Sequence, residues 1–358
     1  MVDKNLVEFI GYVKTETDKR LDEIFDAKIA RAGELDSEYK KLLIETKKQV
    51  LRGGKRLRPA LAVLGYKIAG GKKIETMLDT AVALEIFHNY LLIHDDFMDR
   101  DDRRHGGLNI TGVYKKKLQR VLKPSNLQHI ADSQAILAGD ICCGLSYEVI
   151  TQSGFGSEAK LRAVDRLNQA VFEVAAGQQL DILASFMQKV SMRHVLKINY
   201  YKTAGYSVIM PLQFGAILAG DGAKLHPIIE EYGEGVGIGY QLVDDVIGMF
   251  GSERVIGKPV ISDLREGKQT LLYFYGMALS NKSQKAFLEK SFRNPNANMA
   301  MLKEVRAILE DNGAKAKTLL LAKSKADEAT KIAPKLTSNP ELQKLLISFA
   351  NYCVERKY

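Results

Sequence analysis

The sequence contains few of the residues that mark disulfide-rich, zinc-stabilised or disordered proteins. Among its 358 residues there is no tryptophan, and there are eight prolines and three cysteines. So few prolines do not indicate a collagen-like or disordered chain. The cysteines, Cys142, Cys143 and Cys353, are odd in number and form no C-x-x-C pair, which predicts a reducing cytoplasm without a disulfide framework or a zinc site.

Long hydrophobic runs are also missing. The longest apolar stretch, SVIMPLQFGAILAG from Ser207, is shorter than the roughly 20 residues that a membrane-spanning helix needs. The N-terminal stretch MVDKNLVEFIGYVKTETDKR lacks the basic start and apolar block of a signal peptide. We therefore expect a cytoplasmic chain without a transmembrane segment.

The chain is basic, with a formal net charge of +9, and its lysines are spread through 40–73, 115–123 and 303–335. Such an excess is compatible with a phosphate-bearing partner, including nucleic acid. However, the chain has neither an aromatic RNA-binding motif nor the spacing of a zinc finger. We interpret the lysines as a solvated surface and predict no nucleic-acid partner.

Apolar residues recur at helical spacing along most of the chain, and clear strand-like alternation is scarce. The pattern is strongest over 76–98, 167–187, 194–220 and 228–251. The length alone allows two domains. The absence of a linker or a repeat favours one all-helical domain over residues 1–358, a bundle of helices around a central cavity. Within it, we expect 320–336 to be a peripheral, solvated helix.

Five of the ten residues in IHDDFMDRDD (93–102) are aspartates. If the preceding helix continues, Asp95, Asp99 and Asp102 share one face with Leu91 and, further back, His88. Several carboxylates on one stripe are difficult to keep ionised together unless cations lie between them, and oxygen ligands suit Mg²⁺. A solvated helix end, balanced by Arg100, Arg103 and Arg104, is an equally good interpretation of this segment alone.

A second acidic pair, Asp244 and Asp245, lies inside an otherwise apolar helical pattern, where unpartnered carboxylates are costly. Two such clusters facing each other would bind metal ions around one diphosphate. Basic residues that could grip phosphate oxygens lie elsewhere. They are Lys55 and Arg58 in RGGKRLRP, Lys202 beside Thr203, and Lys258 and Lys268 around Asp263.

Taken in order, these motifs resemble the trans-isoprenyl diphosphate synthases, or polyprenyl synthetases. The resemblance runs from end to end, through GGKRLRP, HDDFMD, SQAILAGD, GQQLD, KTA, GYQLVDDVIG, GKPVISDLREGKQT and FANYCVERKY. It implies an all-α fold, a homodimer, three Mg²⁺ ions, and head-to-tail condensation of isopentenyl diphosphate with allylic prenyl diphosphates.

The resemblance also implies roles for single residues. Metal ligands holding the allylic diphosphate would be Asp95, Asp99 and Asp244. Groups that grip this diphosphate would be Lys202, Lys258 and Arg104, with Thr203 and Gln241 nearby, and Lys268 would contribute to substrate binding. The isopentenyl diphosphate site would consist of Lys55, Arg58 and His88.

The sequence departs from the family pattern at two positions. The second acidic motif ends in Gly248, where the family usually has a third aspartate, so we expect weakened metal binding, with Asp263 as outer support. His105 stands where the family has an arginine, unless a shifted turn lets Arg103 replace it. These departures leave a non-catalytic regulatory subunit as the alternative. A head-to-head synthase would not be expected to carry GGKRLRP.

In this family, the residues four and five positions before the first aspartate help to set the floor of the product pocket. Here they are Leu91 and Tyr90. Helical phase favours Leu91, while the resemblance also points to Tyr90. One bulky aromatic residue, without an insertion in the first motif, favours a twenty-carbon product, geranylgeranyl diphosphate, over fifteen-carbon farnesyl diphosphate.

Overall fold

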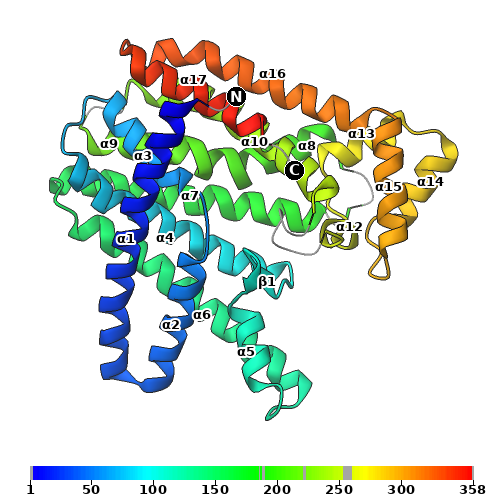
Figure 1. Ribbon diagram of the computed structural model, residues 1–358, viewed down its shortest axis with the longest axis horizontal. Helices are drawn as coiled ribbons and strands as arrows, with labels where there is room; N and C mark the ends of the chain where they lie inside the picture. Colours follow the sequence, from blue (N-terminus) through cyan, green and yellow to red (C-terminus); the bar gives the residue numbers. More distant parts are fainter. Residues whose placement is uncertain (1–2, 185, 188–189, 221–222, 253–259, 357–358) are drawn as a thin grey trace.

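The computed structural model describes residues 3–184, 186–187, 190–220, 223–252 and 260–356. The described chain is almost entirely helical, which confirms the predicted all-α fold (Figure 1). In chain order the elements are α1 (Lys4–Leu35), α2 (Ser37–Leu51), α3 (Leu57–Ile68), α4 (Ile74–Met98), β1 (Arg103–Arg104), β2 (Gly107–Leu108), α5 (Ile110–Leu118), α6 (Pro124–Gln152), α7 (Ser157–Ala184), α8 (Met192–Asn199), the π-helix η1 (Tyr200–Ile209), α9 (Met210–Leu218), α10 (His226–Phe250), α12 (Ser262–Glu266), α13 (Leu271–Leu279), α14 (Lys282–Ser291), α15 (Met299–Asp311), α16 (Ala314–Leu336) and α17 (Pro340–Val354).

Side-chain caps fix where several helices begin. The Asp36 carboxylate accepts hydrogen bonds from the backbone N–H groups of Glu38 and Tyr39 at the start of α2. Asn281 and Gln284 form a reciprocal capping box at the start of α14. Such caps satisfy N–H groups that have no partner within the helix, so polar residues between apolar patterns become helix boundaries.

The core is built around helices that are apolar on all sides. Every residue of α9 is buried, and α4 is buried along most of its length. Helices α3 and α9 cross at close range, because a Cβ atom on Gly215 would lie 1.9 Å from the carbonyl oxygen of Ala62. On Gly65 it would lie 2.2 Å from that of Leu212. The crossing therefore requires glycine at both positions.

The segment 320–336 is helical, as expected, but it is not solvated on all sides. This segment is the larger part of α16, which packs along α10 and buries Ala322, Ala326, Ala329 and Ala333 (Figure 1). The small alanine side chains allow the two helices to approach closely. The lysines between them make the sequence look like that of a solvated helix.

Two short strands, β1 and β2, form an antiparallel hairpin between α4 and α5 that the sequence pattern did not reveal. Its turn places His105 (φ 50°) and Gly106 (φ 75°) in the left-handed region. Among the helices of the described residues, none combines the length and the apolar character needed to cross a membrane.

Three long helices bring their C-terminal ends to one region, where the acidic residues are. Asp95 lies in the last turn of α4, Asp181 near the end of α7 and Asp244 near the end of α10. Helix C-termini carry partial negative charge, so carboxylates gathered there need cations nearby.

Candidate active site

Helix α4 ends at Met98, so it does not continue through the first acidic segment as far as Asp102. Arg100 adopts φ 58°, and the N–H groups of Arg100 and Asp101 donate to the carbonyl oxygens of Phe97 and Asp96. This Schellman-type ending turns the chain away from the helix axis. The prediction that Asp102 shares a stripe with Asp95 and Asp99 was therefore wrong.

Asp102 lies outside the helix and forms an ion pair there. Its carboxylate lies 2.7 Å from Nζ of Lys115 on α5. The pair joins the segment after α4 to the next helix, which gives Asp102 a structural contact rather than a place among the other acidic residues.

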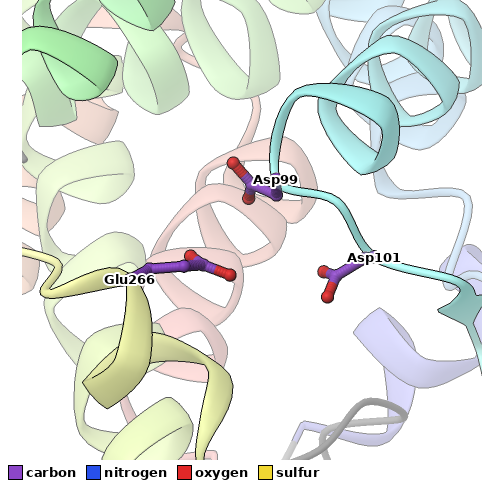
Figure 2. A group of neighbouring side chains, drawn as sticks. All are labelled: Asp99, Asp101 and Glu266. Atoms are coloured by element: carbon purple, nitrogen blue, oxygen red, sulfur yellow. The ribbon is translucent and has the colours of Figure 1, made fainter. Parts of the chain in front are cut away.

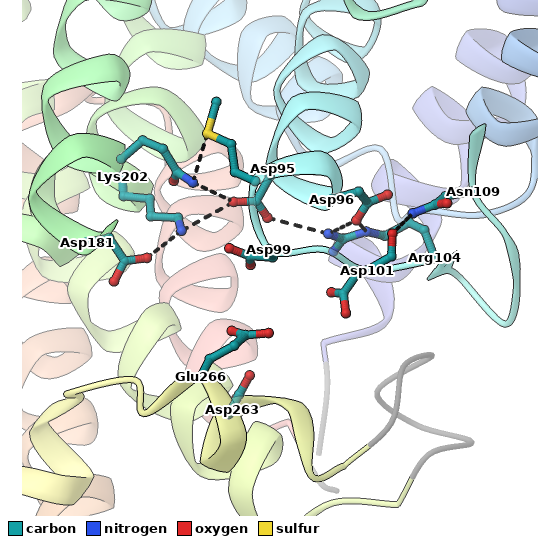
Figure 3. Close-up of polar contacts among 12 residues, drawn as sticks. Asp95, Asp96, Asp99, Asp101, Arg104, Asn109, Asp181, Lys202, Asp263 and Glu266 are labelled. Atoms are coloured by element: carbon teal, nitrogen blue, oxygen red, sulfur yellow. Dashed lines mark hydrogen bonds and ion pairs between the residues drawn. The ribbon is translucent and has the colours of Figure 1, made fainter. Parts of the chain in front are cut away.

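Asp95 faces α7 and the π-helix (Figure 3). Its Oδ1 accepts a hydrogen bond from Nε2 of Gln178 at 3.1 Å and lies 3.3 Å from Nζ of Lys202. Lys202 Nζ also donates to Oδ2 of Asp181 at 2.6 Å. Lys202 thus balances carboxylates from two different helices.

Lys202 and Thr203 are carried by the π-helix η1, which the sequence analysis did not anticipate. Thr203 donates to Oε1 of Gln241 at 2.6 Å, and Nε2 of Gln241 donates to Oδ1 of Asp245 at 2.8 Å. This chain of hydrogen bonds links the π-helix to the second acidic segment. Wide π-turns occur often at functional sites, since they re-aim side chains within a continuous helix.

Arg104 anchors the hairpin to the first acidic segment. Its Nε donates to Oδ1 of the buried Asp96 at 2.7 Å, its Nη2 forms a further short contact with the same oxygen, and Nη2 lies 3.4 Å from Asp95. Burial raises the pKa of Asp96 to about 6 even beside this guanidinium. Arg104 is therefore held beside Asp95, where the sequence predicted a diphosphate-binding group.

A third group of carboxylates joins the first segment to α12. One oxygen from each of Asp99, Asp101 and Glu266 lies within 4.8 Å of the others (Figure 2). Lys268 Nζ lies 3.4 Å from Asp99 and 3.4 Å from Glu266. The sequence analysis missed Asp101 and Glu266, although both belong to segments it singled out. Lys258 lies outside the described residues.

The second acidic segment is partly paired and partly unpaired. Asp244 Oδ1 accepts a hydrogen bond from Nη1 of Arg356 at 2.7 Å. Burial, together with Asp263 and Asp244 nearby, raises the pKa of Asp245 to about 8. The buried Oδ2 of Asp245 has no hydrogen-bond partner among the described residues. An oxygen-rich cluster with an orphaned buried oxygen fits a hard cation such as Mg²⁺.

Two of the predicted isopentenyl diphosphate residues, Arg58 and His88, lie beside Tyr206 of the π-helix. The guanidinium of Arg58 lies 4.6 Å from the Tyr206 ring centroid and donates to Oγ of Ser207 at 2.7 Å. The His88 ring lies 6.1 Å from Tyr206. Burial and the nearby Arg58 lower the pKa of His88 well below its usual range. Arg58 Nε and His88 Nδ1 are buried and lack hydrogen-bond partners among the described residues.

Lys55 and His105 border this basic region. Lys55 is exposed and its Nζ lies 5.1 Å from the ring centroid of Tyr352. A Cβ atom on Gly53 would lie 3.4 Å from the His105 side chain, so His105 sits against the Gly53–Gly54 turn. Arg103 is exposed and donates to the carbonyl oxygen of Gly106. His105, not Arg103, therefore occupies the position beside the turn.

Tyr90 and Leu91 lie on α4, just before the first acidic segment in the chain. Tyr90 packs 5.7 Å from the Phe87 ring and 4.9 Å from the His94 ring, and contributes to two hydrophobic clusters. Leu91 contributes to one of them. Both side chains are partly buried, and their role as a pocket floor stays a prediction.

Comparisons with known proteins agree with this arrangement. The family model described as polyprenyl synthetase matches residues 40–309. The chain is 32% identical to a geranylfarnesyl diphosphate synthase of Aeropyrum pernix, covering 85% of this chain and 91% of the relative. It is also 32% identical to a geranylgeranyl diphosphate synthase of Methanosarcina mazei, over 86% and 87%. A solved geranylgeranyl pyrophosphate synthase from Corynebacterium glutamicum, complexed with isoprenyl diphosphate and magnesium, superimposes with a TM-score of 0.91 at 26% identity, over 98% and 99%.

Proposed function

Because the chain belongs to the polyprenyl synthetase family, we propose that it condenses isopentenyl diphosphate head-to-tail with allylic diphosphates as a magnesium-dependent trans-prenyltransferase. The family assignment confirms the resemblance found in the sequence. The observation that carries the proposal is the pairing of Lys202 with Asp95 and of Lys268 with Asp99 in the first acidic segment, with the charge of Lys268 also reaching Asp245 of the second. The product we propose is the twenty-carbon geranylgeranyl diphosphate, with farnesyl diphosphate as the shorter alternative.

The proposal extends to the organisation of the chain. It includes one polyprenyl synthetase domain over residues 1–358, a cytoplasmic location and a homodimer. The extensive contact between α10 and α16 and the shared cluster of Leu6, Leu212 and Phe349 support one domain, since residues from both ends build one core.

We assign the metal-binding role to Asp95, Asp99 and Asp244, with three Mg²⁺ ions in the complete complex. The oxygen ligands fit Mg²⁺, which keeps several waters and is commonly bound together with substrate phosphates. When bound, Mg²⁺ supplies Lewis-acid stabilisation of the negative charge on the diphosphate.

In this proposal, basic side chains bind the allylic diphosphate. Lys202 and Lys268 are paired with carboxylates. A diphosphate carries more negative charge than one carboxylate and would bind these lysines more strongly. Lys258 and Arg104 belong to the same set in this proposal. Thr203 and Gln241 position the segment through the hydrogen bond that joins them.

The second diphosphate would bind at the basic region around Tyr206. Arg58 Nε and His88 Nδ1 are buried polar atoms that a diphosphate could satisfy, and Lys55 adds an exposed cation. The lowered pKa of His88 keeps its imidazole neutral, so it contributes one hydrogen bond rather than a charge.

The reaction then needs no side-chain nucleophile. The allylic C–O bond breaks and both electrons leave with the diphosphate, where Lys202 and Lys268 stabilise the charge. The double bond of isopentenyl diphosphate attacks the resulting carbocation and forms the new C–C bond. A proton is lost to the released diphosphate. The apolar lining around Tyr90 and Leu91 keeps water from the carbocation.

Product analysis tests the proposal directly. Purified chain, Mg²⁺ and labelled isopentenyl diphosphate are incubated separately with five-, ten- and fifteen-carbon allylic diphosphates, and the dephosphorylated alcohols are separated by length. We expect a Mg²⁺-dependent twenty-carbon product. A fifteen-carbon product keeps the activity and corrects the length.

The departures at Gly248 and His105 favour one other outcome. If folded protein binds diphosphate but yields no product from any primer, the chain is better explained as a regulatory subunit of a heteromeric synthase. Addition of a catalytic relative that restores or lengthens product formation would support that second function.

A further inference from the structure

The stretch between the first acidic segment and the first turns of α6 carries charge of one sign only. Residues 103–131 contain no aspartate or glutamate, although the whole chain has 43 of them. The stretch contains seven basic residues, namely Arg103, Arg104, Lys115, Lys116, Lys117, Arg120 and Lys123. It therefore accounts for most of the net charge of +9, which the sequence alone made look like an even, solvated coat of lysines.

Only some of these cations are neutralised by carboxylates. Three of them pair with acids of neighbouring elements, namely Arg104 with Asp96, Lys115 with Asp102 and Lys117 with Glu45. Lys116, Arg120 and Lys123 are exposed and have no ion-pair partner in the part of the chain that the structure describes. Their positive charge is therefore available to a partner outside the chain.

The three unpaired cations lie on one compact turn that projects from the molecule. Helix α5 ends at Leu118, whose carbonyl oxygen accepts hydrogen bonds from the N–H groups of Val121 and Leu122 at 3.0 and 3.1 Å, and α6 begins at Pro124. Figure 1 shows α5 and this turn extending from the body of the molecule at the lower end of the view, on the side away from α16. We call residues 116–123 the basic tip.

Helix stability explains only part of this charge. Lys116 lies in the last turn of α5, where a cation interacts favourably with the helix dipole. Lys123 is the N-cap residue of α6, where a cation is unfavourable, and its side chain caps no N–H group. Arg120 lies between the two helices and contributes to neither. The arrangement costs α6 some stability, which indicates that these cations serve a contact outside the fold.

An apolar side chain lies among the unpaired cations. Val121 directly follows Arg120 and is 74% exposed. A single exposed valine is ordinary on a protein surface. On a projecting turn between cations, however, it matches the composition of segments that bind at a bilayer interface. There, basic side chains meet lipid phosphates and an apolar side chain reaches the acyl boundary.

We propose that the basic tip binds the surface of a bilayer that contains anionic phospholipids. Lys116, Arg120 and Lys123 contact the lipid phosphates, and Val121 enters the boundary between headgroups and acyl chains. A nucleic acid would also neutralise the cations, but its phosphate backbone offers no apolar environment for Val121. The proposal goes beyond the proposed function and does not depend on it, since no residue of the basic tip belongs to the candidate active site.

Cosedimentation with vesicles tests the proposal. We expect the full chain to bind vesicles of phosphatidylcholine with phosphatidylserine, to ignore vesicles of phosphatidylcholine alone, and to bind more weakly as salt rises. The variant Lys116→Gln/Arg120→Gln/Lys123→Gln should bind at least about tenfold more weakly, because each cation near an anionic surface contributes about fivefold.

A matched variant separates the basic tip from bulk charge. Lys303→Gln/Lys323→Gln/Lys331→Gln removes the same charge from exposed lysines of α15 and α16 and should bind like wild type. An equal loss in both triple variants, or wild-type binding by the variant of the basic tip, would overturn the proposal. Melting temperatures confirm that the variants fold, and Arg120→Gln alone still decides if the triple variant does not.

Val121→Ser distinguishes a bilayer from a polyanion. It should weaken vesicle binding by about threefold or more, because an apolar side chain no longer leaves water, and leave the salt needed to elute the chain from heparin unchanged. Binding to duplex DNA without binding to anionic vesicles would overturn the proposal in favour of a nucleic-acid surface. Prenyl transfer, measured without vesicles, should be unchanged in the triple variant of the basic tip, so the proposed function is tested separately.

Discussion

Arg356 Nη1 lies 2.7 Å from Oδ1 of Asp244, so a residue near the C-terminus holds the leading carboxylate of the second acidic segment. The same guanidinium stacks 3.8 Å from the ring centroid of Tyr240 and donates to its carbonyl oxygen. Arg356 is thus paired with a carboxylate to which the proposed function assigns a metal ion.

Replacement of Arg356 by glutamine should therefore strengthen Mg²⁺ binding. The Asp244 side chain is more than a third exposed, so solvent screens the pair and the gain should be only about two- to fivefold. Calorimetric titration with inorganic diphosphate present measures it. Arg103→Gln, at an exposed arginine on the hairpin, is the control, and weaker binding by Arg356→Gln would contradict the competition between Arg356 and metal.

Lys202 should be essential for the departure of the diphosphate. Lys202→Ala removes a cation from beside the leaving group, so we expect kcat to fall by about a hundredfold or more. Lys197→Ala, at an exposed lysine on α8, should keep wild-type turnover. A Lys202→Ala enzyme within a few-fold of wild type would remove Lys202 from the mechanism.

His88 should make the free protein sensitive to acid. Its pKa in the folded state lies below its value in the unfolded chain, because burial and Arg58 disfavour the imidazolium. The unfolded chain therefore binds the proton more readily, and stability falls as the pH drops below the unfolded pKa of about 6.5.

His88→Gln should accordingly flatten the fall in melting temperature between about pH 7 and pH 5. It should also raise KM for isopentenyl diphosphate. His129→Gln, at an exposed histidine on α6, should keep the wild-type slope. An unchanged slope in His88→Gln would show that His88 titrates normally.

Tyr90 and Leu91 can be separated by product length. Tyr90 packs between the Phe87 and His94 rings, and its removal opens space between two hydrophobic clusters. We expect Tyr90→Ala to add at least one five-carbon unit to the product and Leu91→Ala to have the smaller effect. Chromatography of the dephosphorylated products measures both, and an unchanged product from Tyr90→Ala would exclude it as the floor.

The crossing of α3 and α9 should tolerate no added methyl group. Gly215→Ala places a Cβ atom 1.9 Å from the Ala62 carbonyl oxygen, a backbone atom that cannot move alone. We expect a loss of about 2–3 kcal/mol in the free energy of unfolding, the upper part of the range for overpacking. Gly11→Ala, with open space around it, should instead stabilise the helix by up to about 1 kcal/mol in the same denaturant titration.

Much of the architecture could be predicted from periodicity, because apolar helices must bury their faces. The pattern located α4 and α10 and the acidic residues near their ends. It failed where local geometry departs from the regular helix. Asp102 leaves the stripe since Arg100 takes a left-handed conformation, and the π-helix at Lys202 has no hydrophobic signature of its own.

Contacts between segments that lie far apart in the chain could not be predicted from sequence spacing. Glu266 meets Asp99 and Asp101 only because α12 folds back against the end of α4 (Figure 2). In the sequence, Gly248 appeared only as the loss of a carboxylate. The structure shows that the Asp263 carboxylate lies in the space beside it. The lysines of α16 concealed a buried alanine face in the same way.

In the proposed function, the π-helix η1 would separate the two reactants. Its first turn carries Lys202 toward the acidic residues, while Tyr206 and Ser207 further along contact Arg58. The number of residues between them sets how the electrophile and the nucleophile are separated and aimed. Deletion of one residue here would rotate one set of groups about the helix axis relative to the other. Both substrates could then still bind, yet their carbon atoms would no longer meet.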